Sequence, residues 1–315
     1  MNKIIIFSFL LLILLSSACS QEKKDTLGWH KSGFIGANFS QAAFSNWAAG
    51  GVNSIAGTGL FNFIDKYRGY KKYWDNSLDL AFGFLKSDDQ GIQKSDDKID
   101  LSSNYGKYAF GKFYYSAQLD FLTQFAKGYN YPNDSVVVSK FMAPGYLTLG
   151  IGLNWKPNKY FSLFFSPITG KFTFVLDQVL ADAGAYGVDS ALHDSNGNKI
   201  QDGKQIRTQF GAYLNALFEK EIFKNIQFAT KLQLFNDYTD KNASNRTNID
   251  VNWETGLIMK VNGFLSAAVS TQLIYINDVP VPIYQTINGI KTQTGKGPRT
   301  QFKESLAISI GYKFN

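Results

Sequence analysis

Charged side chains recur at alternate positions in several segments of this sequence, the spacing that places them on one face of a strand. Carboxylates dominate the first half of the chain, and basic groups join them in the second half. If the walls of one water-filled passage carried these charges, they would orient polar solutes and select among ions. The residues are Asp75, Asp79, Asp100 and Asp120, then Arg207, Lys231, Lys303 and Lys313, with Asp250 and Glu254 interposed.

The same charges have a second interpretation. In a narrow closed barrel they would pair with one another and fill the interior, and the width of the interior depends on the number of strands. The first interpretation predicts that replacing Asp79 or Asp120 with Asn changes ion selectivity without unfolding the protein. At about 12 strands, the number that the sequence favours below, both interpretations remain open.

Residues that could catalyse a reaction are few. The two histidines, His30 and His193, fall at opposite ends of the architecture predicted below. The run His193-Asp194-Ser195 contains the three residue types of a hydrolytic triad. Adjacent loop residues cannot make the successive hydrogen bonds that a triad needs. We therefore predict that the protein is not an enzyme; a hydrolase that used this run would lose turnover on His193→Ala.

The same loop also carries oxygen-bearing side chains at calcium-loop spacing. They stand at the first, third, fifth and ninth positions of that loop. Lys199 occupies the place where such a loop needs Gly, and no Glu follows at its twelfth position. We favour a simple Asn-Gly turn, keep a calcium ion as the alternative, and expect no other cofactor. The four candidate ligands are Asp194, Asn196, Asn198 and Asp202.

These side chains must be positioned by strands, because alternation continues along much of the chain. In 300–314 most even positions are apolar, from Phe302 to Phe314, while the odd positions are polar or small. No apolar run after residue 20 is long enough for a transmembrane helix. A composition of 44% hydrophobic and 16% aromatic residues with one cysteine excludes a disordered chain and a disulfide scaffold. Similar alternation covers 113–123, 147–155, 226–234, 249–260 and 265–275.

Loop lengths indicate the kind of all-β protein. Short turns alternate strictly with long polar loops. The long loops are 87–96, 127–142, 168–204, 239–246 and 278–299. Such sorting is typical of a transmembrane antiparallel β-barrel with short periplasmic turns and long extracellular loops, because only a closed sheet satisfies its backbone in lipid. We predict about 12 strands. They are 30–41, 53–67, 70–86, 97–109, 112–126, 143–156, 159–167, 205–220, 225–238, 247–260, 264–277 and 300–314.

Aromatic residues gather beside the short turns, where a girdle at the lipid head groups is expected. The set is Trp29, Tyr67, Tyr70, Tyr73, Trp74, Trp155, Tyr160, Phe223, Phe264, Tyr312 and Phe314.

The two longest loops differ in character. The 168–204 loop begins with apolar residues and is expected to fold, as a gate, a plug or a docking surface. The 278–299 loop is rich in Thr, Gly and Lys and is expected to be solvated and mobile. The sequence thus predicts a porin-like channel for small polar solutes or, alternatively, a structural or assembly partner whose long loops dock onto another envelope protein.

The first 20 residues have the pattern of a secretory signal peptide. Lys3 precedes an apolar stretch, and small residues follow it. Lipidation of Cys19 is the rival processing route, although Ser16 stands where a lipobox usually has Leu. The predicted order is signal peptide 1–20, periplasmic stub 21–29 and barrel 30–315, exported to the bacterial outer membrane. Its formal charge of +7 then favours contact with anionic lipid and lipopolysaccharide, and nucleic acid is not an expected partner.

One string of residues resembles a known family. Asn38-Phe39-Ser40-Gln41 is followed by Asn46-Trp47-Ala48-Ala49-Gly50-Gly51 and by Asn53-Ser54. From about residue 27 onward the chain resembles an uncharacterised family of Bacteroidota outer-membrane proteins classified as a domain of unknown function. The resemblance implies a β-barrel and supplies no activity or ligand. On the strand map, Trp47 would cap the barrel mouth or anchor in the outer leaflet, and Gly50 and Gly51 would allow a tight fold-back.

Overall fold

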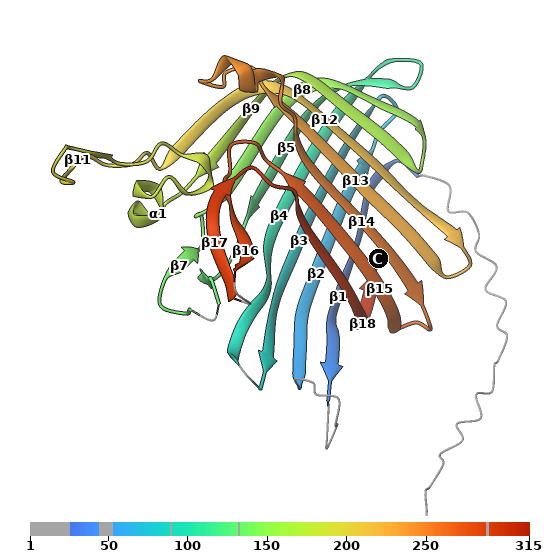
Figure 1. Ribbon diagram of the computed structural model, residues 1–315. Coiled ribbons are helices and arrows are strands. Elements are labelled where there is room, and N and C mark those ends of the chain that lie inside the picture. The colour runs from blue at the N-terminus through green and yellow to red at the C-terminus, as the bar shows by residue number, and fades with distance from the viewer. Residues whose placement is uncertain (1–25, 44–52, 89, 132, 288–289) are drawn as a thin grey trace, which may run out of the picture.

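The computed structural model describes residues 26–43, 53–88, 90–131, 133–287 and 290–315. In these residues twelve long antiparallel strands form one closed barrel, as predicted (Figure 1). The predicted signal peptide 1–20, Cys19 and the motif residues Asn46, Trp47, Gly50 and Gly51 lie outside the described residues. The barrel strands are β1 (Gly28–Ala42), β2 (Ser54–Arg68), β3 (Lys72–Ser87), β4 (Gln90–Phe110), β5 (Phe113–Thr123), β8 (Gly145–Asn158), β9 (Phe161–Phe174), β12 (Ile206–Phe223), β13 (Ile226–Asp237), β14 (Asp250–Lys260), β15 (Leu265–Tyr275) and β18 (Gln301–Phe314).

Alternation along each strand sorts side chains between the outside and the interior of the barrel. On β18, Leu306 and Ile308 are 67% and 58% exposed, whereas Ser309, the residue after Ile308, is only 5% exposed. Large apolar side chains therefore cover the outer face, which suits contact with hydrocarbon, and polar side chains face inward. None of the helices within the described residues is long and apolar enough to cross a membrane.

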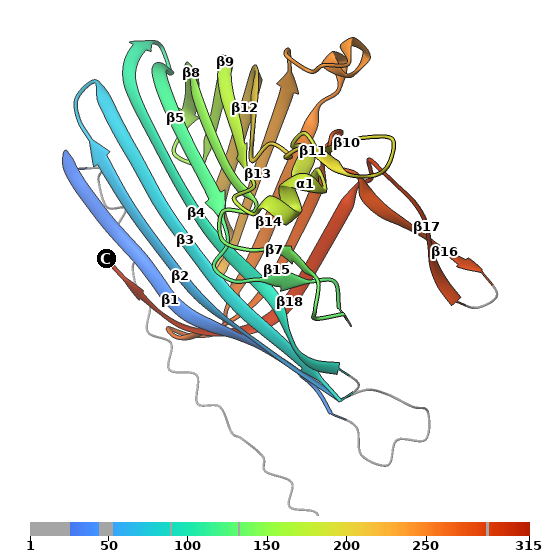
Figure 2. The same cartoon turned by 90° about the vertical axis from the view of Figure 1, so that its left-hand side faces the viewer.

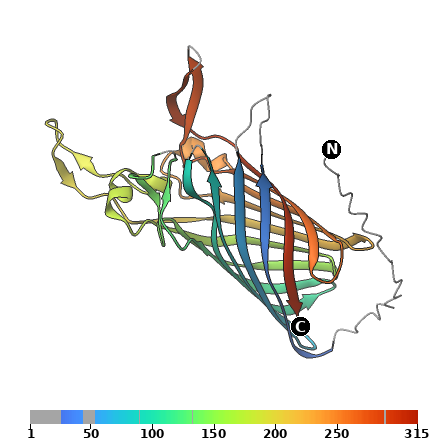
Figure 3. The ribbon, with the colours of Figure 1, turned by 90° about the horizontal axis from the view of Figure 1, so that it is seen from below.

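The connections divide between the two ends of the barrel. Tight turns join β2 to β3, β4 to β5, β8 to β9, β12 to β13 and β14 to β15 at the end that also holds the C-terminus, here named the short-turn end. The other connections lie at the opposite, long-loop end (Figures 1 and 3). They contain β6 (Gly128–Tyr129), β7 (Val137–Ser139), α1 (Gln178–Asp182), η1 (Ala185–Gly187), β10 (Leu192–His193), β11 (Lys199–Gln201), η2 (Ala243–Thr247), β16 (Val281–Ile287) and β17 (Ile290–Gly297).

The barrel closes between its first and last strands. β1 pairs with β2 along its whole length, from Gly28 to Ala42, but it pairs with β18 only from Gly33 to Phe39. The ring of Phe34 lies against Gly311 on β18, where an added Cβ would come within 2.3 Å of the ring. Glycine at position 311 is therefore what allows the two edge strands to approach.

Aromatic residues near the short-turn end form an outward-facing row. Trp29 packs against Tyr67 and Trp74 with ring centroids 5.3 and 5.8 Å apart, and Trp74 packs against Tyr105. Tyr73 does not belong to this row, contrary to the prediction. It is 4% exposed and points into the barrel, because the turn before β3 places odd-numbered positions inside.

Most strand boundaries lie within a few residues of the prediction, and two strands extend well beyond it. The 87–96 segment was expected to be a loop, yet β4 begins at Gln90 and pairs with β3 up to Ser87. Polar residues can remain in a strand here, because the hairpin extends past the apolar band into water. β9 was expected to end at Pro167 but continues to Phe174. Register shifts around Ser166 show a bulge there, which accommodates a residue that lacks a backbone N–H.

Residues 175–205, named the cap loop, fold into a compact unit at the long-loop end. Asp177 accepts a hydrogen bond from the backbone N–H of Leu180 and so begins α1. Val175, Leu180, Ala181 and Val188 form a buried apolar cluster with Ala143 of the 124–144 loop. The β10–β11 hairpin of the cap loop and the separate β16–β17 hairpin both project away from the barrel (Figures 2 and 3). The 278–299 segment, expected to be solvated and mobile, thus contains a hairpin.

Candidate functional site

An elongated cavity lies inside the barrel between the β1–β3 wall and the β13–β18 wall. Its volume is about 730 Å³, and we name it the inner chamber. Four of the predicted charged residues line it: Asp79, Lys231, Glu254 and Lys303. Asn62 on β2 donates a hydrogen bond of 2.5 Å to Asp79. The walls also carry apolar side chains such as Leu60 and Leu217, so the chamber is only partly polar.

Lys231 is the central positive charge of the interior. It pairs in register with Glu254 on β14. Inward-facing carboxylates from β14 and from strands across the barrel interact electrostatically with its ammonium group: Asp79 on β3, Asp100 on β4, Asp120 on β5 and Glu254 on β14. Lys98 contributes a second cation 3.9 Å from Asp100. These carboxylates still outnumber the two cations, so this part of the interior carries a net negative charge.

A hydrogen-bonded chain crosses the barrel interior beside the chamber. The carboxylate of Asp120 accepts hydrogen bonds from Ser102 at 2.7 Å and from Gln118 at 2.6 Å. The hydroxyl of Tyr213, on the far side of two intervening strands, donates to it at 3.2 Å. Gln233 donates to Tyr213, which extends the chain to β13. Asp120 therefore holds a polar core in place and does not line the inner chamber.

Asp75 lies at the short-turn end in an ion-paired cluster. Its carboxylate is bound by the Arg68 guanidinium and, at 2.8 Å, by the ammonium of Lys156. Lys156 also lies 3.5 Å from the ring centroid of Tyr73, a cation–π contact. The paired-interior interpretation of the sequence thus describes this level of the barrel. At the level of Asp79 the charged residues line the inner chamber, and a selective passage there stays a prediction.

Asp250 and Arg207 lie at the long-loop end, whereas Lys313 lies at the short-turn end, near the end of β18. Asp250 pairs with Lys171 of β9 at 2.9 Å, across two intervening strands. Arg207 reaches Asp278 at 2.5 Å and Asp237 at 3.7 Å. These pairs tie the rim of the barrel to the loops after β13 and β15.

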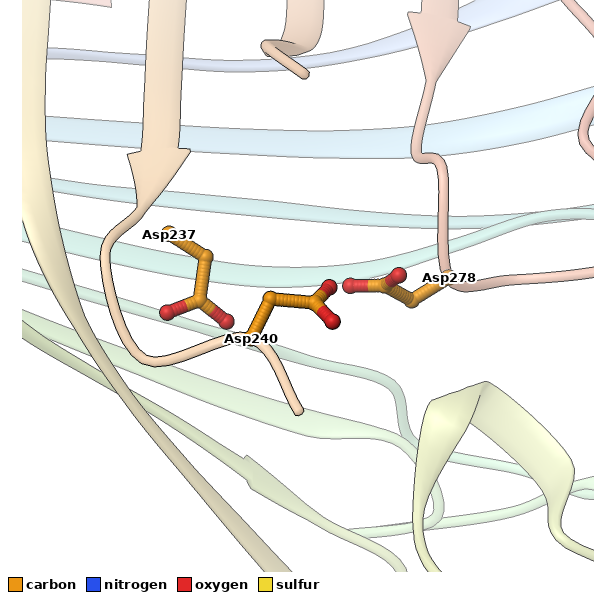
Figure 4. Close-up of side chains that lie close together, drawn as sticks. All are labelled: Asp237, Asp240 and Asp278. Carbon is orange, nitrogen blue, oxygen red and sulfur yellow. The ribbon is translucent and has the colours of Figure 1, made fainter. Parts of the chain in front are cut away.

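Three carboxylates come together beside Arg207. Asp237, Asp240 and Asp278 each place one oxygen within 4.8 Å of the others, and Figure 4 shows Asp240 and Asp278 facing one another. The cluster already contains the guanidinium of Arg207, and Asp237 also accepts a 2.8 Å hydrogen bond from Gln209. The arginine offsets part of the negative charge, so we assign no metal ion to this cluster.

A second cavity of about 450 Å³ lies toward the long-loop end and is named the outer vestibule. Tyr129 and Tyr131 of the 124–144 loop line it, together with Tyr146 of β8. Asp96 on β4 forms an ion pair of 3.3 Å with Lys303 on β18 where the vestibule meets the inner chamber.

The candidate calcium loop adopts a turn held by its own residues. Asp194 accepts hydrogen bonds from the backbone of Asn196 at 2.9 Å and of Asn198 at 2.8 Å. The side-chain hydrogen bond from Asn198 is the largest of the causes that hold the pKa of Asp194 below its usual value. Asp202 instead pairs with Lys199 at 2.7 Å. Calcium binding by these residues stays a prediction.

The two histidines lie far apart along the barrel. His30 is on β1 at the short-turn end, where its Nε2 lies 2.5 Å from the carbonyl oxygen of Thr26. His193 is on the projecting β10–β11 hairpin at the long-loop end. The neighbouring Asp194 carboxylate accepts hydrogen bonds from the backbone of its own turn.

Sequence reasoning missed several residues of the interior. Asp96 was assigned to a loop because the predicted strand began at residue 97. Tyr213 could have been found, because it continues the odd-numbered inward positions of β12 that include Arg207 and Gln209. Lys156 could also have been found, because it continues the even-numbered inward positions of its predicted strand. Lys171 could not, because the bulge after Ser166 moves the inward positions of β9 from even to odd numbers.

Residues 39–129 match a family model described as a protein of unknown function, DUF3078. This match covers part of the chain and agrees with the predicted resemblance to an uncharacterised family. No curated protein matches the sequence significantly.

Several solved outer-membrane barrels have similar structures. An outer membrane channel from Pseudomonas putida F1 aligns with a TM-score of 0.38 at 12% identity, over 92% of this chain and 96% of that one. The translocator domain of the autotransporter NalP from Neisseria meningitidis gives 0.36 at 9%, over 92% and 90%. The NanC porin gives 0.35 at 10%, over 90% and 99%. These are likenesses of general architecture; the strand pairing of this chain itself establishes the closed barrel.

Proposed function

We propose that the protein is an outer-membrane channel through which small polar solutes pass. The observation that carries this proposal is the inner chamber of about 730 Å³, which lies within a closed barrel and is lined by Asp79, Lys231, Glu254 and Lys303. Charged groups beside a water-accessible space can select solutes by charge, whereas charges sealed in pairs cannot. The excess of carboxylates around Lys231 points to a preference for cations.

The membrane location rests on the outer face of the barrel. Exposed apolar side chains such as Ile151 and Ile168, both 73% exposed, cover it away from the loops. With the predicted signal peptide 1–20, this favours export to the outer membrane of a bacterium, with the short-turn end in the periplasm. A Bacteroidota origin, lipid and lipopolysaccharide contacts and the processing of Cys19 belong to the same proposal.

Conductance of the refolded protein in a planar bilayer, with a salt gradient across it, tests the proposal. Wild type is expected to give discrete current steps and a cation preference. Asp79→Asn should lower the cation-to-anion permeability ratio roughly two- to fivefold, because a unit charge about 4 Å from an ion is worth about 1 kcal/mol in water.

The matched control is Asp202→Asn, which removes a carboxylate that is 67% exposed on the projecting hairpin. It should leave the permeability ratio unchanged. A demonstrably folded wild type without current would count against the channel, and an unchanged ratio in Asp79→Asn would count against the role of Asp79.

The cap loop favours a second candidate function, that of an assembly partner for another envelope protein. It is folded around its own apolar cluster, yet Val179 and Ile200 are 78% and 66% exposed. Exposed apolar side chains on an ordered loop are typical of docking surfaces.

Replacing residues 192–201 with two glycines tests this second function. The deletion should leave the barrel intact, because Leu192 and Gln201 are paired neighbours that a short link can join. If the loop docks a partner, a stable complex isolated with wild type in gentle detergent is lost with the variant. A wild-type barrel that purifies alone would argue against an assembly role.

A further inference from the structure

The inner chamber and the outer vestibule meet at one level of the barrel. They share five lining residues, and no other described residue lines both: Ser95, Asp96, Lys98, Gln272 and Lys303. A solute that moves between the two cavities therefore passes these side chains. Two of the five, Asp96 and Lys303, are bound to each other with Nζ and Oδ1 3.3 Å apart.

This ion pair spans the passage rather than one wall. Asp96 belongs to β4 and Lys303 to β18, and β1, β2 and β3 separate these strands in the barrel. Gln272 on β15 is the register partner of Lys303 and so lies beside it. Lys98 lies two residues after Asp96 on β4. The pair therefore bridges two strands of the barrel wall that do not pair with each other through their backbones.

The pair is solvated on both sides. The side chains of Lys303 and Asp96 are 53% and 36% exposed, so water and salt screen their attraction. By contrast, the Lys171–Asp250 pair at the rim has side chains only 15% and 14% exposed. The screened Asp96–Lys303 pair therefore separates readily, whereas the less exposed Lys171–Asp250 pair stays bound.

We propose that Asp96 and Lys303 form the constriction that sets the charge and size selectivity of the passage. The inference rests on the proposed channel function and names two residues that determine its specificity. An entering cation is attracted to Asp96 and repelled by Lys303, and an anion experiences the reverse. The two charges of this pair offset each other, so the pair itself favours neither sign and excludes solutes too wide to part it. Lys98, which lines the same level, is paired with Asp100 at 3.9 Å.

Reversal potentials of single variants separate this role from a structural one. Asp96→Asn leaves Lys303 unopposed and is expected to shift selectivity toward anions, roughly two- to fivefold. Lys303→Gln leaves Asp96 unopposed and shifts it toward cations by a similar factor. A purely structural contact would give shifts of the same sign or none.

The double variant, Asp96→Asn with Lys303→Gln, completes the design. Its selectivity should return toward the wild-type value, because the charges are again balanced. Its conductance should exceed that of wild type, since no ion pair bridges the passage. This gain should shrink as salt is raised from 0.1 M toward 1 M, where the Debye length falls from about 10 Å to about 3 Å and the wild-type pair is screened.

A matched pair on the cap loop provides the control. Lys204 and Asp189 lie 3.0 Å apart with side chains 63% and 40% exposed, close to the values for Lys303 and Asp96. Asp189→Asn and Lys204→Gln should leave reversal potential and conductance unchanged. Heat-dependent mobility in electrophoresis verifies that every variant is folded.

The outcomes distinguish this inference from the proposed function. Opposite shifts in the single variants support the constriction. A conducting wild type with unshifted single variants overturns the constriction and leaves the channel standing. Folded wild type and variants that all fail to conduct overturn the channel itself and the constriction with it.

Discussion

Carboxylates at inward positions of this barrel differ in what binds them. Asp75 is held by two cations, Asp120 by neutral donors, and Asp79 by one amide beside an open cavity. The surroundings of each group, rather than its position in the alternation, therefore decide whether it stabilises the fold or faces solute. Asp79 is the carboxylate best placed for selectivity, and Asp75 is the one best placed for stability.

Asp75→Asn should destabilise the barrel more than Asp79→Asn. Removing the Asp75 charge leaves Arg68 and Lys156, both partly buried, without the anion that they share. Loss of one partner of a fully buried pair costs about 3–5 kcal/mol, and partial exposure reduces this to about 2 kcal/mol. The side chain of Asp75 is 24% exposed. Urea unfolding in lipid or detergent, followed by tryptophan fluorescence, measures the difference.

Asp79→Asn is the matched control, because it keeps a side chain able to hydrogen-bond with Asn62. Its cost should stay below about 1.5 kcal/mol, the net value of one hydrogen bond. Equal unfolding midpoints for the two variants would contradict the assignment of Asp75 to stability.

Inward orientation could be predicted from the sequence, but pairing could not. Alternation fixes which face of a strand a residue occupies, and this placed Asp79, Lys231 and Glu254 in the interior. Which charge meets which depends on register across non-neighbouring strands, as for Lys171 with Asp250. No local pattern encodes that distance, so the division into an open chamber and closed pairs appears only in three dimensions.

At the scale of elements, the cap loop depends on one carboxylate to hold its projecting hairpin. Asp182, the last residue of α1, accepts hydrogen bonds from Lys199 of β11 at 2.8 Å and from the backbone of Gly203 at 2.8 Å. Lys199, then Gln178 and Gly203, lower the pKa of Asp182 to about 2 from its ordinary 3.8. The carboxylate thus joins helix and hairpin only while it is charged.

Acid should therefore loosen the cap loop before the barrel. The folded-state pKa of Asp182 is depressed, so its contribution is complete above about pH 4 and is lost as pH falls through about 2. Cleavage of 178–205 by pepsin should accelerate over this window in wild type. In Asp182→Asn the loop should already be loose at pH 4.

The ratio of wild-type to variant cleavage rates at each pH cancels the pH dependence of pepsin itself. Asp202→Asn, which removes a more exposed partner of Lys199, should behave like wild type. A ratio that stays constant between pH 4 and pH 2 would show that Asp182 does not anchor the hairpin.

Strand number and the sorting of loops followed from sequence because both depend on local signals. Turn residues and alternation located all twelve barrel strands. The early start of β4 and the continuation of β9 past Pro167 did not follow. Polar composition and proline usually end strands, but pairing with β3 and a bulge at Ser166 outweighed them here. The internal fold of the cap loop depends on Ala143 of another loop, a contact that local sequence does not reveal.

For the whole molecule, closure joins segments from opposite ends of the chain. Short turns bring most neighbouring strands together soon after each hairpin forms, whereas β1 must find β18 across almost the full length of the sequence. The entropy lost on closing a loop grows with its length, so this pairing is the slowest to form.

The short β1–β18 pairing has a consequence for assembly. Until it forms, both edge strands expose unpaired backbone groups that can bind other strands. The lower part of β1, from Gly28 to Ser32, has no partner on β18 even after closure. The closed barrel therefore keeps a short strand edge on β1 that does not pair with β18, and a factor that inserts this chain into the bilayer could still bind that edge after the rest of the barrel has closed.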